Sequence, residues 1–415
     1  MRRHLIAAML ACCFGSAHAA FQVQGFELVQ TAPVETSLAN ADLRGSIEVW
    51  TELFDSAKNE ICIGQFYVAS VPGAPFEKVI ERLEAAGKRG VKIRFLIDKK
   101  GVGGLSEKAT VERLRAIPNL EMRVLDVNQL TGNGIIHAKY LTVDRKTAFV
   151  GSQNFDWRAF THIHETGVRI TDAKVAAQVQ AVFDQDWNAQ ATLAAGKTVA
   201  PVQAKAAILA IPTTAAGTLP SDANFLVASP AAFNPAGVAD SETVLPALLA
   251  DARQEIRVTM LDYAPLSYGP GGTRPFYGVL DNALRAAATR GVKVKLMVSH
   301  WNTEKPAIHH LKSLAMLPNV EVRIVTIPKA STGFIPFARV WHSKTMVIDG
   351  KLAWVGTSNW AGGYFDQSRN LEVVMRNDDM AKRLYALQEQ AWSSPYAQPI
   401  DINKDYPKPG KGKEE

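Results

Sequence analysis

The sequence is poor in cysteine. It contains three cysteines in 415 residues, and Cys12 and Cys13 lie in an N-terminal segment that we expect to be removed. The remaining one, Cys62, stands between two isoleucines in an apolar run, so the mature chain can form no internal disulfide. A cysteine in that setting is typical of a small buried hydrophobic side chain, and we assign it no chemistry.

Long apolar runs are missing after residue 20. No later stretch approaches the roughly 18 to 20 consecutive apolar residues that a membrane-spanning helix needs. We therefore expect a soluble mature protein without a transmembrane anchor, which could still contact a membrane peripherally.

The first 19 residues have the pattern of an export signal. Two arginines at residues 2–3 precede a short apolar stretch at residues 5–14 and an Ala-His-Ala cleavage pattern at residues 17–19. This pattern predicts a mature chain that starts at Ala20 and is periplasmic or secreted. Whether the arginines direct general or twin-arginine export stays open.

The charge balance is mildly basic, with a formal net charge of +6 and a sequence pI of about 9.1. Such a balance favours anionic partners without choosing between phospholipid headgroups and nucleic acid. The length exceeds that of one typical core and indicates two domains or a duplicated unit.

The chain repeats itself at a spacing near 200 residues. Residues 84–96 return in similar form at 285–297, and residues 117–124 return at 317–324. Each half has an apolar strand, an amphipathic helix, a second strand led by glycine, and then another helix and strand. The ranges are 60–66, 76–88 and 91–97 in the first half and 255–261, 276–289 and 292–298 in the second. This alternation predicts an α/β protein with largely parallel sheets covered by helices.

The repeat also predicts the domain boundaries. After the signal at 1–19, we expect a first domain at 20–188 and a second at 224–396. They are joined by a linker at 189–223 that is rich in Ala, Thr and Pro, and followed by a flexible basic tail at 397–415.

One motif, His-x-Lys-x4-Asp, occurs once in each half, and each copy has similar polar residues downstream. The first copy has His137, Lys139 and Asp144, followed by Ser152, Asn154 and Glu165; the second has His342, Lys344 and Asp349, followed by Thr357, Asn359 and Glu372. The asparagine follows the histidine by 17 residues in both copies, and the glutamate follows it by 28 and 30. A single copy is weak evidence, whereas two copies with matching downstream residues favour a functional interpretation.

This spacing places the polar side chains together. Residues two apart on a strand point to the same face, so each histidine shares a face with the lysine of its own motif. If the two halves meet around a pseudo-twofold axis, both sets converge on one pocket, which would fit a phosphodiester.

The residue types suit phosphoryl chemistry without a metal or another cofactor. Lysine and asparagine, with the neighbouring Ser152 and Thr357, would hold the phosphate oxygens. One histidine would attack phosphorus and the other would protonate the leaving alcohol and then activate water. Glu165 and Glu372 would fix the imidazole tautomers. Asp144 and Asp349 are as apt to hold turns as to touch substrate, and we treat them as supporting residues.

The duplicated motif resembles the hallmark of the phospholipase D superfamily, and the resemblance spans nearly the whole mature chain. The segments 151–158, 335–342 and 356–360 are similar to the branch that contains animal phospholipases D3 and D4 and poxvirus relatives. That branch includes 5′ exonucleases on single-stranded nucleic acid, with lipid transphosphatidylation also attributed to it. The lumenal animal members use disulfides and glycosylation, whereas this chain keeps one cysteine, as expected of a bacterial secreted member.

The resemblance implies two similar α/β/α sandwich domains packed around a pseudo-twofold axis with one shared active site. It also implies a covalent phosphohistidine intermediate, with His137 as nucleophile and His342 as general acid and base, although the sequence leaves that order open.

The substrate stays open between phospholipid and nucleic acid, for hydrolysis or transfer. Loops at 265–275 and 330–336 could form an apolar rim for lipid or could cap a nucleic-acid end. Aromatic residues close to the motifs could stack on bases; they are Trp157, Trp341, Trp360, Tyr364 and Phe365. The alternatives are a 5′ exonuclease without lipase activity or a non-catalytic protein that binds anionic polymers. Oligomeric state is not predicted.

Overall fold

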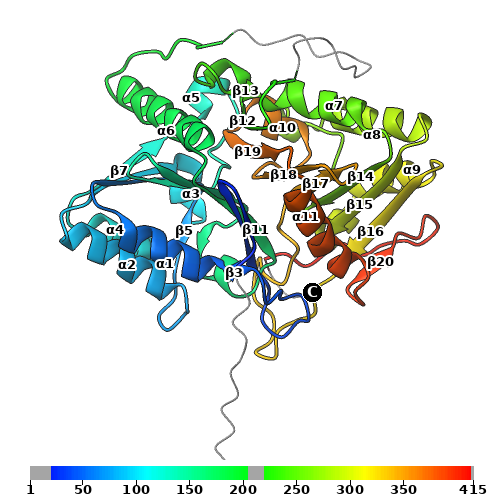
Figure 1. Cartoon of the computed structure of the whole chain (residues 1–415), viewed down its shortest axis with the longest axis horizontal. Helices are drawn as coiled ribbons and strands as arrows, with labels where there is room; N and C mark the ends of the chain where they lie inside the picture. The colour runs from blue at the N-terminus through cyan, green and yellow to red at the C-terminus, as the bar shows by residue number, and fades with distance from the viewer. Residues whose placement is uncertain (1–19, 204–218, 413–415) are drawn as a thin grey trace, which may run out of the picture.

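The computed structural model describes residues 20–203 and 219–412 (Figure 1). The expected signal, the middle of the expected linker and the last three residues lie outside these ranges. Cys12 and Cys13 therefore lie outside them as well.

The first half contains a mixed sheet with the path β1-β2-β11-β9-β8-β4-β6-β7, and β3 pairs with β2. Its strands are β1 (Gln22–Val23), β2 (Phe26–Thr31), β3 (Arg44–Gly45), β4 (Glu60–Gln65), β6 (Lys92–Asp98), β7 (Leu120–Leu125), β8 (Tyr140–Val143), β9 (Thr147–Gly151) and β11 (Glu165–Ile170). Its helices are α1 (Ser46–Ser56), α2 (Glu77–Lys88), α3 (Lys99–Gly104), α4 (Lys108–Arg115), α5 (Asn128–Thr131) and α6 (Ala173–Ala194). The short strands β5 (Val68–Ala69) and β10 (Phe155–Asp156) pair separately.

The second half repeats this plan with the path β13-β12-β19-β18-β17-β14-β15-β16-β20. Its strands are β12 (Asn224–Ser229), β13 (Ala239–Asp240), β14 (Glu255–Met260), β15 (Lys293–Ser299), β16 (Val320–Val325), β17 (Thr345–Ile348), β18 (Leu352–Gly356), β19 (Asn370–Met375) and β20 (Ala397–Pro399). Its helices are α7 (Ser241–Asp251), α8 (Val279–Thr289), α9 (Ala307–Ala315), α10 (Gly362–Asp366) and α11 (Asp378–Trp392). Two similar sheets with helices on their faces confirm the predicted fold class.

The prediction of largely parallel sheets is wrong. Only β4, β6 and β7 run parallel along the main path of the first sheet, and β14, β15 and β16 are their counterparts in the second. The hairpins β8–β9 and β17–β18, which follow the histidine motifs, add antiparallel strands beside them. A two-strand hairpin needs only a tight turn, so it can extend the sheet without a crossover helix.

The two halves share a hydrophobic core. It contains Val150 and Val168 of the first sheet, Val355 and Val373 of the second, and buried side chains of α6 and α11. Each sheet packs its other face against helices of its own half, through α1, α2 and α4 in the first and α7, α8 and α9 in the second. Because the inner faces share one core, the two halves are held in a fixed relation, which positions the residues between them.

Two expected boundaries differ from the structure. Helix α6 continues to Ala194, so the chain leaves the first half later than residue 189. The tail predicted to be flexible from residue 397 begins with β20, which pairs with β16, and side-chain contacts continue to Lys411. The polar composition of the tail correctly indicates that it buries little area. It carries no signal, however, that the tail backbone would pair with the exposed edge of the sheet.

Candidate active site

The two histidines stand where the halves meet. Each His-x-Lys segment lies just before a strand, β8 or β17, rather than on it as predicted. The backbone N–H of His137 donates to the carbonyl of Arg369 at 3.0 Å, and that of His342 donates to the carbonyl of His164 at 2.9 Å. Each histidine is therefore attached to the opposite half, which brings both motifs to one site.

The two imidazoles have different partners. Nδ1 of His137 lies 3.0 Å from Oδ1 of Asn370, and Nδ1 of His342 lies 2.8 Å from Oε2 of Glu165. The amide nitrogen of Asn370 donates to the carbonyl of Tyr364 at 2.7 Å, which turns its oxygen toward His137. An oxygen at that position accepts the Nδ1 proton and leaves Nε2 of His137 with a free lone pair.

Glu372 does not contact either imidazole, so that prediction is wrong. Its buried carboxylate accepts hydrogen bonds from the hydroxyls of Ser241 and Ser358, and burial raises its pKa to about 7. Strand pairing shows why: Gly356 pairs with Glu372, whereas its counterpart Gly151 pairs with Gly167. The true counterpart of Glu165 is Asn370, which follows His342 by 28 residues, as Glu165 follows His137. Requiring equal spacing, rather than the same residue type, would have found it.

The lysines place two fully buried ammonium groups beside the histidines. Lys344 donates to the carbonyl of His342 at 2.5 Å, and Lys139 donates to the carbonyl of His137. Burial lowers the pKa of Lys344 to about 7. Burial lowers the pKa of Lys139 well below its usual range, and the positive charge of Lys344 lowers it further. A bound phosphate dianion or monoanion would stabilise both charges, so the pair forms an anion site.

The histidine pKa values follow the same surroundings. Burial and the nearby lysines lower the pKa of His137 and that of His342 well below 6.5. Burial raises the pKa of Glu165 well above its usual value, and Lys344 opposes that effect. Burial disfavours a net charge on the Glu165–His342 pair. The pair as a whole therefore favours a total charge of zero, with one proton shared between the two side chains.

The two asparagines predicted to hold phosphate occupy matching places in the two halves. Asn154 and Asn359 are buried at equivalent positions after β9 and β18, and the side-chain oxygens of both have no hydrogen-bond partner in the described structure. The amide nitrogen of Asn359 lies 3.5 Å from a carboxylate oxygen of Asp262. A phosphate would accept hydrogen bonds from the amide nitrogens rather than from these oxygens, so the assignment of both asparagines as phosphate ligands stays a prediction.

Ser152 and Thr357 differ from the prediction that they hold phosphate. The hydroxyl of Ser152 lies 3.2 Å from the carbonyl of Thr166 and accepts from the N–H of the same residue. The hydroxyl of Thr357 donates to Asn370 at 3.0 Å and accepts from the N–H of Leu371. Since a hydroxyl has one proton to donate, these two side chains join neighbouring segments instead.

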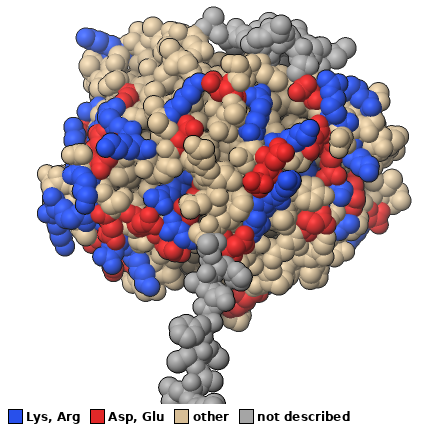
Figure 2. All heavy atoms as spheres, in the orientation of Figure 1, with Lys and Arg blue, Asp and Glu red and all other residues tan. Residues whose placement is uncertain are grey.

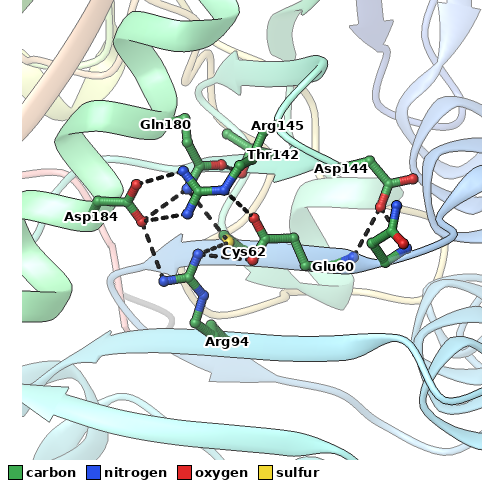
Figure 3. Close-up of polar contacts among 9 residues, drawn as sticks. Glu60, Cys62, Arg94, Thr142, Asp144, Arg145, Gln180 and Asp184 are labelled. Atoms are coloured by element: carbon green, nitrogen blue, oxygen red, sulfur yellow. Dashed lines mark hydrogen bonds and ion pairs between the residues drawn. The ribbon is translucent and has the colours of Figure 1, made fainter.

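The aspartates of the two motifs hold turns. Asp144 accepts three backbone N–H bonds, from residues 58, 59 and 60, at 2.7 to 2.9 Å. Figure 3 labels Asp144 and Glu60. Asp349 accepts the equivalent three, from residues 253, 254 and 255, at 2.7 to 2.9 Å. Both join the turn after the motif strand to the start of the adjacent strand, so of the two roles left open by the sequence these contacts support the structural one.

We expect Asp144→Ala to destabilise the fold without removing activity. Three donors would lose their charged acceptor, which lowers the free energy of unfolding by about 1–3 kcal/mol. Chemical denaturation should show this loss, and Asp349→Ala should behave alike. The hydrogen bonds lower the pKa of Asp144 against the effect of burial, so its contribution is present above the ordinary aspartate pKa and lost as the pH falls through the folded value. A folded variant with activity reduced 100-fold would contradict this role.

Cys62 is buried, as predicted. It lies between Arg94, whose guanidinium is 3.2 Å from the sulfur, and Gln180 (Figure 3). Burial raises the pKa of its thiol. A protonated, inaccessible thiol has little nucleophilic character.

Of the aromatic residues proposed for base stacking, Tyr364 lies at the site. Its ring centroid is 4.7 Å from that of His137. Trp341 stacks on His164 at 3.6 Å, and Trp360 and Phe365 belong to the core of the second half. The remaining one, Trp157, packs against the first-half core and contacts His162. Asn370 and Asp262 are site residues that the sequence analysis missed.

Two kinds of feature are absent from residues 20–203 and 219–412. No group of three or more His, Cys, Asp or Glu side chains there is arranged to hold a metal ion. In the same residues, no helix combines the length and apolar character of a membrane span.

Known proteins resemble both halves of the chain. The family model described as "Cardiolipin synthase, PLD-like domain" matches residues 50–187 and 245–392. A probable phospholipase D of Caenorhabditis elegans is 31% identical over 380 residues, with 85% of this chain and 67% of that protein covered. Phospholipase D Z of Dictyostelium discoideum is 31% identical, with 85% and 86% covered. The 5′-3′ exonuclease PLD4 of Mus musculus is 30% identical, with 85% and 75% covered.

Solved structures support the fold. Phosphatidylserine synthase of Haemophilus influenzae superimposes with a TM-score of 0.60 at 12% identity, and the match covers 92% of this chain and 88% of that one. Both halves match the family model, and relatives at 30% identity or more cover most of the chain. The chain therefore belongs to the phospholipase D superfamily and is a phosphoric diester hydrolase of that superfamily.

Proposed function

We propose that the protein cleaves phosphodiesters in two steps through a phosphohistidine on His137. The observation that carries this proposal is the difference between the two imidazole partners. The carbonyl oxygen of Asn370 is neutral and keeps Nε2 of His137 unprotonated, as a nucleophile requires. The carboxylate of Glu165 can balance a protonated His342, as a general acid requires.

The first step forms the covalent intermediate. Nε2 of His137 attacks phosphorus and forms the N–P bond while the P–O bond to the alcohol breaks. His342 gives its proton to the leaving oxygen. Lys139, Lys344, Asn154 and Asn359 hold the nonbridging oxygens and stabilise the charge on them.

The second step returns the enzyme to its starting state. His342, now neutral, takes a proton from water as the water oxygen attacks phosphorus. The N–P bond breaks and leaves His137 neutral, with its Nδ1 proton still directed at Asn370. An alcohol in place of water would give transfer rather than hydrolysis.

For the substrate we propose phospholipid or nucleic-acid phosphodiesters. The relatives include proteins described as phospholipases D and others described as exonucleases, which supports both. Lys and Arg alternate with Asp and Glu on the face shown in Figure 2, so surface charge there does not favour a polyanion. A 5′ exonuclease without lipase activity is the second candidate, favoured by the phospholipase D3- and D4-like relatives.

The experiment compares two substrates in the presence of EDTA: 5′-hydroxyl single-stranded DNA and phosphatidylcholine vesicles. His137→Ala and His342→Ala are the test variants, and His309→Ala, at an exposed histidine, is the matched control. Activity that resists EDTA and is lost in both test variants supports the proposal. Activity retained in either variant contradicts it, and the substrate that is cleaved separates the two candidates.

The lowered pKa values predict an acidic optimum for kcat/KM. His137 must be neutral to attack, and its pKa lies well below 6.5, so the acid limb should fall below that pH. Lys344 must be charged to hold phosphate, and with a pKa of about 7 it loses that charge as the pH rises. His342 must be protonated to act as the acid, and because its pKa is also lowered, it loses its proton in the same direction. A profile measured with a soluble diester should decline above neutrality, whereas a plateau extending to pH 9 would contradict the account.

We also propose that the protein is exported, as the pattern of residues 1–19 indicates, and is a bacterial member of the superfamily. N-terminal sequencing of the secreted or periplasmic protein should find Ala20 first.

A further inference from the structure

The C-terminal segment, residues 400–412, crosses the surface of the second half after β20. None of its residues is fully buried. Backbone carbonyls fasten it: that of Lys404 accepts from Lys312 at 2.6 Å, that of Pro407 from Thr303 at 3.0 Å, and that of Lys411 from the N–H of Phe337 at 2.6 Å. Contacts of this kind fix a path without burying much apolar surface, so the segment can detach more easily than a core element.

Glu304 is the main charged anchor of this segment. Its two carboxylate oxygens bind Lys408 at 3.0 Å and Lys411 at 2.9 Å. The Lys411 ammonium also lies 5.6 Å from the ring centroid of Trp301. Ion pairs with exposed members are weak and are screened by salt, so one carboxylate holds two lysines reversibly.

Open space lies under the segment. Gly410 and Thr326 both line two cavities, of about 290 and 600 Å³. The segment is therefore packed loosely against the body of the protein.

Lys411 reaches the side of the active site beyond Asn359. Together with Asp262, Tyr268, Trp301 and Glu304, it borders a cavity of about 240 Å³. Asp262 is the residue 3.5 Å from the amide of Asn359, and burial raises its pKa while the charges of Lys411 and Lys344 lower it. The same carboxylate is thus close to an active-site lysine and to the end of the C-terminal segment.

We propose that residues 400–412 form a strap that selects substrates by size, with Lys411 closing the side of the active site beyond Asn359. A small diester would reach the histidines with the strap in place. A diester with a bulky group on that side would need the strap to be displaced from Glu304 and Trp301. This inference rests on the proposed function, because it takes Asn359 as a phosphate ligand.

The test compares a small diester, bis(4-nitrophenyl) phosphate, with a bulky one, phosphatidylcholine in mixed micelles or a single-stranded oligonucleotide, whichever the protein cleaves. The variants are Glu304→Gln, Lys411→Ala and a chain ending at residue 406. Lys108→Ala is the matched control, because Lys108 is exposed and its ion pair with Glu112 lies on helix α4 of the other half.

We expect kcat/KM for the bulky substrate to rise several-fold in all three strap variants, with the small diester within twofold of wild type. Trypsin should also cut the Glu304→Gln protein after Lys411, which is followed by glycine, faster than wild type. Equal kcat/KM values for the bulky substrate in wild type and all strap variants, or a parallel change for both substrates, would overturn the strap. If wild type cleaves neither substrate, the proposed function fails instead, so the two failures are distinguishable.

Discussion

His137→Asn is expected to lower kcat/KM for bis(4-nitrophenyl) phosphate by about 10⁴-fold or more. The substitution removes the proposed nucleophile, Nε2 of His137, and leaves the lysines to bind the diester. The remaining rate would come from phosphate binding and electrostatic stabilisation alone. Release of 4-nitrophenol, followed by absorbance, measures this directly.

His342→Asn is expected to behave differently. Its proton matters for an alkyl alcohol, which leaves poorly as an alkoxide, and matters little for 4-nitrophenol, which leaves readily as an anion. In the first step, the fall in rate caused by His342→Asn should therefore be much larger for an alkyl diester than for the nitrophenyl diester. If both variants lost activity equally on both diesters at every step, the division of roles would be wrong.

Arg369→Met is expected to lower the free energy of unfolding by about 3–5 kcal/mol, the usual cost of breaking a buried ion pair. Arg369 and Asp186 are both 2% exposed and pair through two hydrogen bonds of 2.8 Å across the two halves. The guanidinium also donates to the carbonyls of Ser229 and Phe233 and to the side chain of Asn234. Removing it leaves a buried carboxylate without its cation.

The loss of unfolding free energy in Arg369→Met should depend on pH, in a direction that follows from the pKa of Asp186. Burial already raises the pKa of Asp186, and Arg369 opposes that rise. In the variant the folded-state pKa would rise further above the unfolded value, so the deficit should shrink on acidification and grow as the pH rises. Arg383→Met is the matched control, because Arg383 also pairs across the halves with Asp42, which is 40% exposed. We expect that control to cost less than about 1 kcal/mol. Equal losses in the two variants would contradict the role of burial.

Much of the site could be predicted because the chain repeats itself. Equivalent positions in two similar halves converge by symmetry, so the pairs His137 and His342, Lys139 and Lys344 followed from spacing alone. The parallel strands and their helices also followed, since hydrophobic period and glycine position determine them locally. The antiparallel strands did not, because short apolar runs carry no signal of direction.

The errors arose where the halves differ. The carboxylate of Glu372 lies among hydroxyls because its strand partner Gly356 lacks a side chain. In the first half Gly167 stands there, and Gln153 fills the adjacent space and donates to Ser46 at 3.0 Å. Where one residue lacks a side chain, a residue distant in sequence fills the space. Such pairs cannot be recognised from one sequence alone. Residue type alone therefore pointed to Glu372 as an imidazole partner. The strand register points to Asn370, which contacts His137.

The most direct test of the account is to find the covalent intermediate. His342→Asn protein, mixed with bis(4-nitrophenyl) phosphate and quenched within the first turnover, should carry a phosphoryl ester adduct, because the base that activates water is missing. Peptide mass spectrometry under alkaline conditions should place the adduct on His137, with about one equivalent of nitrophenol released. An adduct on another residue, or full turnover with no adduct in the wild type or the variant, would contradict a phosphohistidine on His137.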